Sequence, residues 1–150
     1  MPQLALQTGT VAGTIALLVQ LTAGDVDITP VAPPKTMRID RTAPVISSVK
    51  ITKLTTESFE VAITGFSTTR EVSSAAFQFT PAAGSRLETS DVTVSTAEVA
   101  QAWYRDPRSN DYGSQFTFIQ PFTVRGATLG EVSVTLSNAQ GTSQAARAQF

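Results

Sequence analysis

Residues 58–66 have the sequence SFEVAITGF, and this segment decides the fold class. Its large apolar residues Phe59, Val61 and Ile63 stand at every second position, with polar or small residues between them. Successive side chains of a strand point to opposite faces, so this alternation predicts a strand with one buried face. The segment therefore indicates a β-sheet that covers a hydrophobic core on one side.

The same alternation recurs along the chain, between turns rich in Gly, Ser and Thr. Short strands separated by about 8–12 residues are typical of β-sandwiches. The chain has no Cys…Trp…Cys arrangement, which argues against an antibody-type domain. The sequence thus predicts an all-β, immunoglobulin-like antiparallel β-sandwich. The other expected strands lie at 4–8, 14–22, 35–40, 45–54, 73–80, 91–94, 115–124, 131–138 and 143–150.

One short helix is predicted near residues 96–105. Ser95 and Glu98 have the spacing of a capping box, with Ser95 as the N-cap. Pro107 stops the helix, because proline clashes with continued helical backbone. Residues 108–114 are then expected to form a polar loop. Pro121 interrupts the strand that follows, which predicts an edge position or a bulge there.

The best candidate for a domain boundary is Ala43-Pro44. Pro44 fixes its own φ angle and pushes Ala43 toward extended geometry, which makes a semi-rigid joint. We therefore expect residues 1–43 to form an N-terminal segment of strands and residues 44–150 to form the sandwich module. Within the first segment, Gly24 and Asp25 are the natural tip of a turn, and the Pro-rich stretch at 30–34 suits an edge or a connection.

The composition excludes several classes of function. The net charge is −1 and the charges are scattered, so nucleic-acid binding has little support. Because the chain has neither His nor Cys, Ser–His and Cys–His catalysis, disulfides and thiolate metal sites are impossible. The most apolar run, at 15–21, is too short to span a membrane. We expect no enzymatic activity and no cofactor.

Residues 103–113 form the most distinctive polar and aromatic stretch. They hold the only Trp and both Tyr residues of the chain. Trp103, Tyr104, Arg105 and Tyr112 are residue types that are common at binding hot spots and sugar-stacking platforms. This favours a glycan- or protein-binding loop as one hypothesis. The simpler interpretation is that Trp103 closes one end of the core and the tyrosines cover its edge.

Two clusters of acidic residues are weak candidates for calcium binding, since oxygen atoms are the only metal ligands available. Asp25 and Asp27 form one, and Asp106 and Asp111, with Asn110 nearby, form the other. Neither has the spacing of an EF-hand loop. Asp and Asn also occur in turns because their side chains bond the local backbone, and we favour this interpretation.

Several blocks resemble Ig-like or fibronectin-like modules of bacterial surface proteins. They are GTVAGTIALLVQLTAGDVDITP, PVAPPKTMRIDRTAPVISSV, TREVSSAAFQFTPAAG and GSQFTFIQPFTV. On this resemblance, residues 1 to about 43 look like the last strands of a preceding repeat. The resemblance implies a structural or adhesive module of an extracellular or cell-surface protein. Its partners would be proteins or like modules, or further copies joined by strand addition, and it implies no catalytic residues.

Overall fold

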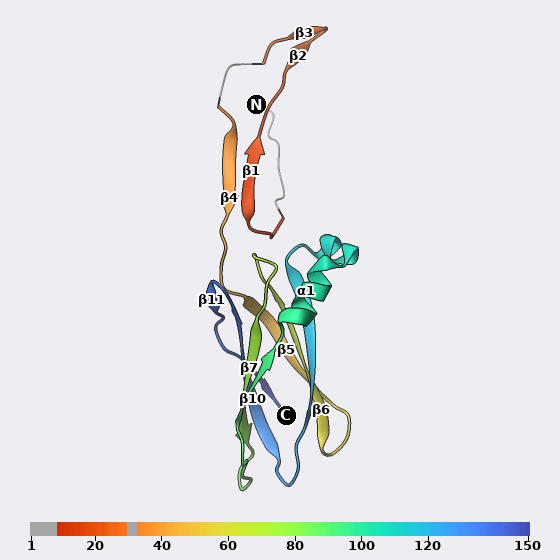
Figure 1. Ribbon diagram of the computed structural model, residues 1–150, viewed down its shortest axis with the longest axis vertical. Helices are drawn as coiled ribbons and strands as arrows, with labels where there is room; N and C mark the ends of the chain where they lie inside the picture. Colours follow the sequence, from red (N-terminus) through yellow and green to blue (C-terminus); the bar gives the residue numbers. More distant parts are fainter. Residues whose placement is uncertain (1–8, 30–32) are drawn as a thin grey trace.

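The computed structural model describes residues 9–29 and 33–150. Strands make up 50% of it and helices 11%, and the sheets are antiparallel, so the all-β prediction is confirmed. The molecule has two parts: a β-sandwich and a long β-hairpin arm that projects from one end of it (Figure 1). The arm lies in the N-terminal residues and the sandwich in the remainder of the chain.

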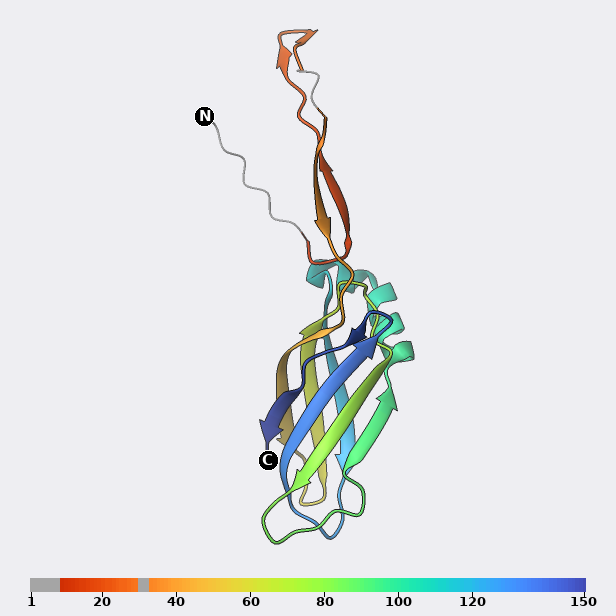
Figure 2. The ribbon, with the colours of Figure 1, turned by 90° about the vertical axis from the view of Figure 1, so that its left-hand side faces the viewer.

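The sandwich consists of two sheets that pack face to face (Figure 2). The first sheet has three strands in the order β5-β6-β9. The second has the order β11-β10-β7-β8, and β12 also pairs with β10. All of these pairs are antiparallel. The strands are β5 (Val45–Lys53), β6 (Ser58–Phe66), β7 (Ser74–Pro81), β8 (Asp91–Ser95), β9 (Gln115–Thr123), β10 (Leu129–Asn138), β11 (Gly141–Thr142) and β12 (Ala146–Gln149).

The core lies between β6 and β10. The alternating residues of SFEVAITGF are buried, as predicted: Phe59 is 4% exposed, and Val61 and Ile63 are fully buried. β10 contributes Val132, Val134 and Leu136, which are equally inaccessible. Burial of apolar surface is the main favourable term in folding, so these two strands stabilise the sandwich. Five phenylalanines pack edge-to-face or stacked at the end of the core away from the arm: Phe59, Phe77, Phe79, Phe122 and Phe150.

Pro121 lies in β9, which forms one edge of the first sheet. It stands opposite Glu60 of β6, and no strand of the described residues pairs with β9 on its other side. Proline lacks an N–H group, so an edge strand tolerates it where a central strand would lose a hydrogen bond. The predicted edge position is confirmed, although the strand continues through the proline to Thr123 without a break.

The connection from β8 to β9 contains helix α1 (Ala97–Arg105), close to where the sequence predicts it. The predicted capping box is wrong. Ser95 is the last residue of β8, and the N-cap is Thr96, whose side chain makes no capping bond. Thr96 is buried, and its hydroxyl donates a hydrogen bond of 3.0 Å to the carbonyl oxygen of Val72. A tertiary contact has therefore replaced the local cap.

Residues 108–114 are not the irregular polar loop that the sequence predicts. A 3₁₀ helix, η1 (Pro107–Tyr112), follows α1 directly. Pro107 occupies its first turn, where its missing N–H costs nothing. The side chain of Asp106 accepts a hydrogen bond from the backbone N–H of Arg108 and caps the helix. Local capping chemistry thus orders a segment whose polar composition suggested a loop.

The arm is a β-hairpin in which β1 (Gly13–Leu17) pairs with β4 (Lys35–Ile39). A smaller hairpin of β2 (Thr22–Ala23) and β3 (Val26–Asp27) forms its tip. The predicted turn at Gly24-Asp25 is confirmed: it joins β2 to β3, and Gly24 has a φ angle of 61°, which glycine adopts without strain. Figure 1 shows the arm extending well beyond the sandwich.

The strand predicted at residues 14–22 is too long. In the structure β1 ends at Leu17, and the chain is irregular until β2 begins at Thr22. Among the described residues, 18–21 form no strand pair, and the backbone of Leu21 is bonded to Ile28 and to the Thr29 hydroxyl. Apolar alternation alone therefore does not produce a strand there. The expected strand at 4–8 and residues 30–32 of the Pro-rich stretch lie outside the described residues.

Candidate functional site

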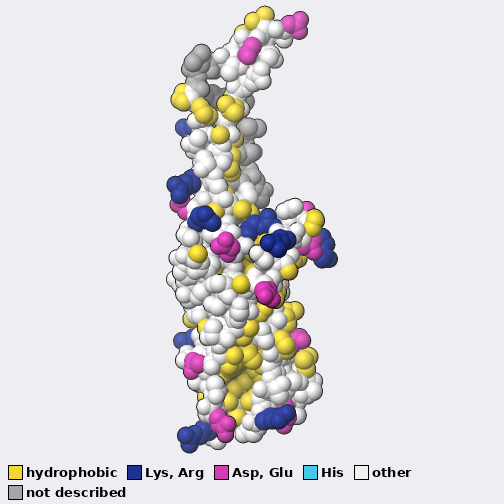
Figure 3. Space-filling view, in the orientation of Figure 1, with side chains coloured by type: hydrophobic (Ala, Val, Ile, Leu, Met, Phe, Trp, Pro, Cys, Tyr) yellow, Lys and Arg dark blue, Asp and Glu magenta, His cyan; other side chains and the backbone are white. Residues whose placement is uncertain are grey.

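The arm exposes apolar side chains that a stable monomer would normally bury. Leu18 is 83% exposed, Val19 66% and Val26 63%. Most of the large apolar residues that the described part of the chain exposes belong to this region, and Figure 3 shows hydrophobic side chains on the arm as well as on the sandwich. Contiguous exposed apolar surface usually marks an interaction site. The set comprises Val11, Leu17, Leu18, Val19, Leu21, Val26, Ile28 and Met37.

The arm also carries unpaired strand edges. β1 pairs with β4 and, among the described residues, with no other strand. Each of the two strands therefore presents one free row of backbone N–H and C=O groups, which can template pairing with another strand. Apolar side chains and free edges together fit recognition by β-strand addition.

The root of the arm is fixed to the sandwich through both of its strands. On the β1 side, the backbone N–H of Ala12 donates to the carbonyl oxygen of Thr68 at 2.7 Å. On the β4 side, the backbone N–H of Thr42 donates to the hydroxyl of the same Thr68 at 3.0 Å. Pro44, the predicted joint, is fully buried. The arm is therefore held in one direction relative to the sandwich.

The structure separates the four residues of the predicted aromatic site. Trp103 packs against the core, and its Nε1–H donates to the carbonyl oxygen of Gln115 at 2.9 Å. Tyr112 is 56% exposed, with its ring centroid 5.8 Å from that of Trp103. Arg105 is exposed on the surface of α1. Trp103 and Tyr112 alone form a small aromatic surface.

Tyr104, a partly buried residue of α1, has a structural role. Its hydroxyl donates a hydrogen bond of 2.7 Å to the carbonyl oxygen of Ser114. Burial of the phenol disfavours the phenolate and raises the pKa of Tyr104 to about 12, although the nearby Arg70 charge opposes the shift. Tyr104 therefore stays neutral at physiological pH and serves as a hydrogen-bond donor.

Arg70 organises this region, and sequence reasoning missed it. Its guanidinium lies 5.1 Å from the centre of the Tyr104 ring, and its Nη2 donates to the Tyr104 carbonyl oxygen at 2.7 Å. The same nitrogen also donates to the hydroxyl of buried Ser109. Arg70 adopts a φ angle of 56°, which is rare for a residue with a side chain. No local motif signals this role, because the partners lie more than 30 residues away.

The acidic candidates lie in two separate places. Asp25 and Asp27 are at the arm tip, where Asp27 accepts a hydrogen bond of 2.8 Å from the backbone N–H of Thr29. Hydrogen bonds from Thr29 lower the pKa of Asp27. Asp106 and Asp111 lie around η1. Within residues 9–29 and 33–150, no group of three or more acidic side chains converges on a metal site.

Asp106 is engaged by its neighbour Arg108. The Nε of Arg108 lies 3.1 Å from both carboxylate oxygens, and these bonds lower the pKa of Asp106 to about 2. Hydrogen bonds to the charged form of a carboxyl favour ionisation. The carboxylate therefore acts as a helix cap and an ion-pair partner.

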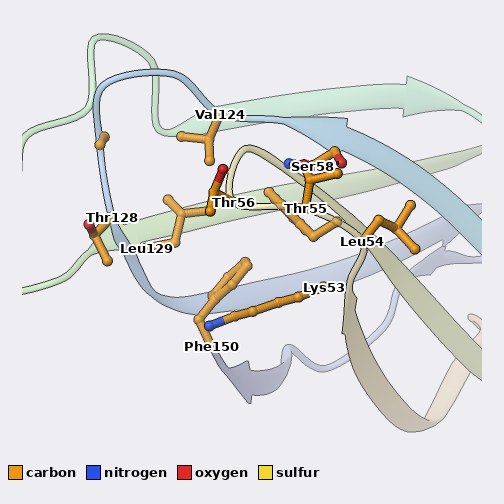
Figure 4. A pocket seen from close by; sticks show the side chains of 11 residues that line it. Lys53, Leu54, Thr55, Thr56, Ser58, Val124, Thr128, Leu129 and Phe150 are labelled. Carbon is orange, nitrogen blue, oxygen red and sulfur yellow. Dashed lines mark hydrogen bonds between the residues drawn. The ribbon is translucent and has the colours of Figure 1, made fainter.

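A hollow of about 450 Å³ opens at the pole of the sandwich opposite the arm (Figure 4). Its walls come from the β5–β6 turn, the β9–β10 loop and Phe150. Lys53 is the one ionisable side chain among the residues that line it. Such a surface is suited to apolar contact, and it offers no acid–base pair for catalysis.

Comparison of the chain with protein-family models, curated proteins and solved structures finds no match. Among the residues that the structure describes, no helix has both the length and the apolar character that crossing a membrane requires.

Proposed function

We propose that this chain is a non-catalytic structural module that joins other β-sandwich modules through its arm, in an array of an extracellular or cell-surface protein. The arm carries the proposal. It projects from the sandwich, exposes apolar side chains such as Leu18 and Val19, and keeps two strand edges free. Strand pairing with another protein would cover both features.

An immunoglobulin-like (fibronectin-like) assignment is supported by the order of the strands. Without the two-residue β11, the sandwich has seven strands, which we number from β5. The first, second and fifth form one sheet, and the third, sixth and seventh lie in the other. Constant-type immunoglobulin domains divide these six strands in the same way. The fourth strand, β8, differs because it pairs with the third. The division at residue 44 is supported by the arm's separate strand pairing.

A mechanical role is supported by the fixed root. Because hydrogen bonds reach Thr68 from both strands of the arm, a force applied to the arm is transmitted to the sandwich. A loosely tethered arm would instead act as a flexible linker. The array proposed here therefore consists of modules with a defined mutual orientation.

The arm's role as a contact surface is tested by self-association. In the absence of another partner, arms of separate copies are expected to cover one another, so the average mass in light scattering should rise with concentration. Leu17→Glu with Val19→Glu should abolish this rise. Ile119→Glu is the matched control, since Ile119 is 53% exposed, between Leu17 at 36% and Val19 at 66%, but lies on the sandwich. A wild-type mass that stays monomeric at every concentration would contradict assembly between chains.

A second candidate function is binding of a glycan or a protein by the 103–113 segment. The exposed ring of Tyr112 beside Trp103 favours it, since aromatic platforms stack on sugars. Tyr112→Ala tests it better than Trp103→Ala, because Trp103 also packs against the core. Glycan-array binding that is lost in folded Tyr112→Ala would support this function, and a wild-type array without any signal would count against glycan binding.

A further inference from the structure

The arm repeats the register of the hairpin that closes the sandwich. In the arm, Gly13 pairs with Ile39, Ile15 with Met37 and Leu17 with Lys35. In the sandwich, Val132 pairs with Ala148 and Val134 with Ala146 in the same antiparallel sense. Two residues before Val132 along β10, the carbonyl oxygen of Gly130 accepts a hydrogen bond of 3.0 Å from the backbone N–H of Phe150. Gly13, Ile15 and Leu17 thus correspond to Gly130, Val132 and Val134, and their partners correspond as well.

The sequence supports the same equivalence at a constant offset of 117 residues. Ile15, Leu17 and Val19 align with Val132, Val134 and Leu136, all branched apolar residues. Gly24 and Gly141 also align at this offset, but Gly24 lies in the β2–β3 turn and Gly141 pairs with Asn138 in β11, so the structural equivalence is limited to β1 and β4. The same apolar alternation at equivalent register positions supports treating β1 and β10 as two copies of one structural unit.

The two copies differ in what covers them. Val132, Val134 and Leu136 are fully buried, because β7 pairs along β10 and β6 packs against its inner face. The corresponding face of the arm has no such cover: Val19 is 66% exposed and Met37 42%. Alternating apolar residues on a strand are suited to a position with one buried face, so the arm lacks its complement.

We propose that the arm is the closing hairpin of a second β-sandwich, whose remaining strands resemble β5 to β9 of this chain and belong to the preceding module of an array. This inference rests on the proposed function and names the partner of the arm. The partner is an incomplete sandwich of five strands. Its equivalent of β7 pairs with the free edge of β1, and its equivalent of β6 covers Ile15, Leu17 and Val19.

The equivalence also sets how successive modules are arranged. Phe150 lines the hollow at the pole opposite the arm (Figure 4), and Ile39 takes its place in the second sandwich. The chain then reaches the first strand of the next sandwich, β5, within residues 40–44. Two sandwiches would therefore stand end to end, joined by the short segment that Thr42 and buried Pro44 fix in place.

A two-module chain tests the proposal, with residues 1–129 joined directly to residues 13–150. The first unit lacks β11, β12 and all of β10 after Leu129, and the arm of the second unit is placed to replace them. We expect both units to fold and the heat of unfolding to approach twice that of the single chain. Hydrogen exchange at Ile15, Leu17 and Val19 of the joined arm should slow by at least about 100-fold, as expected when frayed residues enter a cooperative core.

Matched variants of the two-module chain show whether the first unit depends on packing of the arm's alternating apolar side chains or on any apolar contact with the arm. Ile15→Ser, Leu17→Ser and Val19→Ser together in the joined arm should leave the first unit unfolded and sensitive to protease. Ala16→Ser with Leu18→Ser, at the intervening positions, should leave it folded. A first unit that stays unfolded while the second folds normally would overturn the proposal, and self-association through Leu17 and Val19 could still support the proposed function.

A single-sandwich graft provides a second measurement if the two-module chain is insoluble. In it, residues 13–40 replace residues 130–150 of the chain. The graft is expected to unfold in one cooperative transition with denaturant. A graft without a cooperative transition would also overturn the proposal.

Discussion

The side chain of Asn138 holds the backbone of Thr42. The Nδ2 of Asn138, at the end of the central strand β10, donates a hydrogen bond of 3.0 Å to the carbonyl oxygen of Thr42 at the root of the arm. The same amide lies 3.1 Å from the hydroxyl of Thr69, and Asn138 is 9% exposed. A residue of the core strand therefore positions the segment that joins arm and sandwich.

Replacing Asn138 should loosen this joint. Asn138→Ala removes the hydrogen bond to the Thr42 carbonyl oxygen, and a typical intramolecular hydrogen bond contributes about 0.5–1.5 kcal/mol. We expect the free energy of unfolding to fall by that amount in urea titrations and hydrogen exchange to rise near Thr42. Gln140→Ala is the control, because that side chain is exposed. An unchanged free energy of unfolding would show that the contact contributes nothing to the joint.

Two leucines with very different exposure should respond differently to truncation. Leu136→Ala removes a fully buried side chain from the core, which typically costs about 2–5 kcal/mol. Leu18→Ala removes a side chain that is 83% exposed and should change stability by less than about 0.5 kcal/mol. Denaturant unfolding of both variants measures the difference. A comparable loss for Leu18→Ala would mean that the arm is covered in solution.

Tyr104 should ionise only at strongly alkaline pH. Its pKa is raised to about 12 in the folded protein, so the neutral phenol favours folding. That contribution is complete below the unfolded value near 10 and is lost as pH rises through 12. Ultraviolet titration of Tyr112→Phe isolates Tyr104, and the phenolate signal should appear near pH 12 together with loss of stability. A phenolate signal near pH 10 in the folded variant would contradict the buried position.

Arg70 should anchor α1 and η1 through the shape of its guanidinium. Arg70→Lys keeps the charge, but the shorter side chain lacks the Nη2 that donates to both the Tyr104 carbonyl oxygen and the Ser109 hydroxyl. We expect a loss of about 1.5–3 kcal/mol, the range for hydrogen bonds to charged groups, together with faster hydrogen exchange in η1. Arg105→Lys on the exposed face of α1 is the control. Equal stability of the two variants would remove Arg70 from this role.

The strands of the sandwich and the presence of one helix follow from the sequence because their signals are local. Alternation with a period of two specifies which side chains share a face, and Phe59, Val61 and Ile63 are buried together as predicted. The helix near residues 96–105 and the turn at Gly24 follow from equally local chemistry.

Tertiary structure decided the rest. The hydrogen bonds of Thr96 and Arg70 reach backbone carbonyl oxygens that lie far away in sequence. Every residue has such an oxygen, so the sequence does not reveal which one is the partner. The arm illustrates the limit most clearly. Ile15, Leu17 and Val19 have the pattern of a core strand, yet only the fold shows that no sheet formed by the described residues covers them. Alternation specifies a face to be buried and leaves open what buries it.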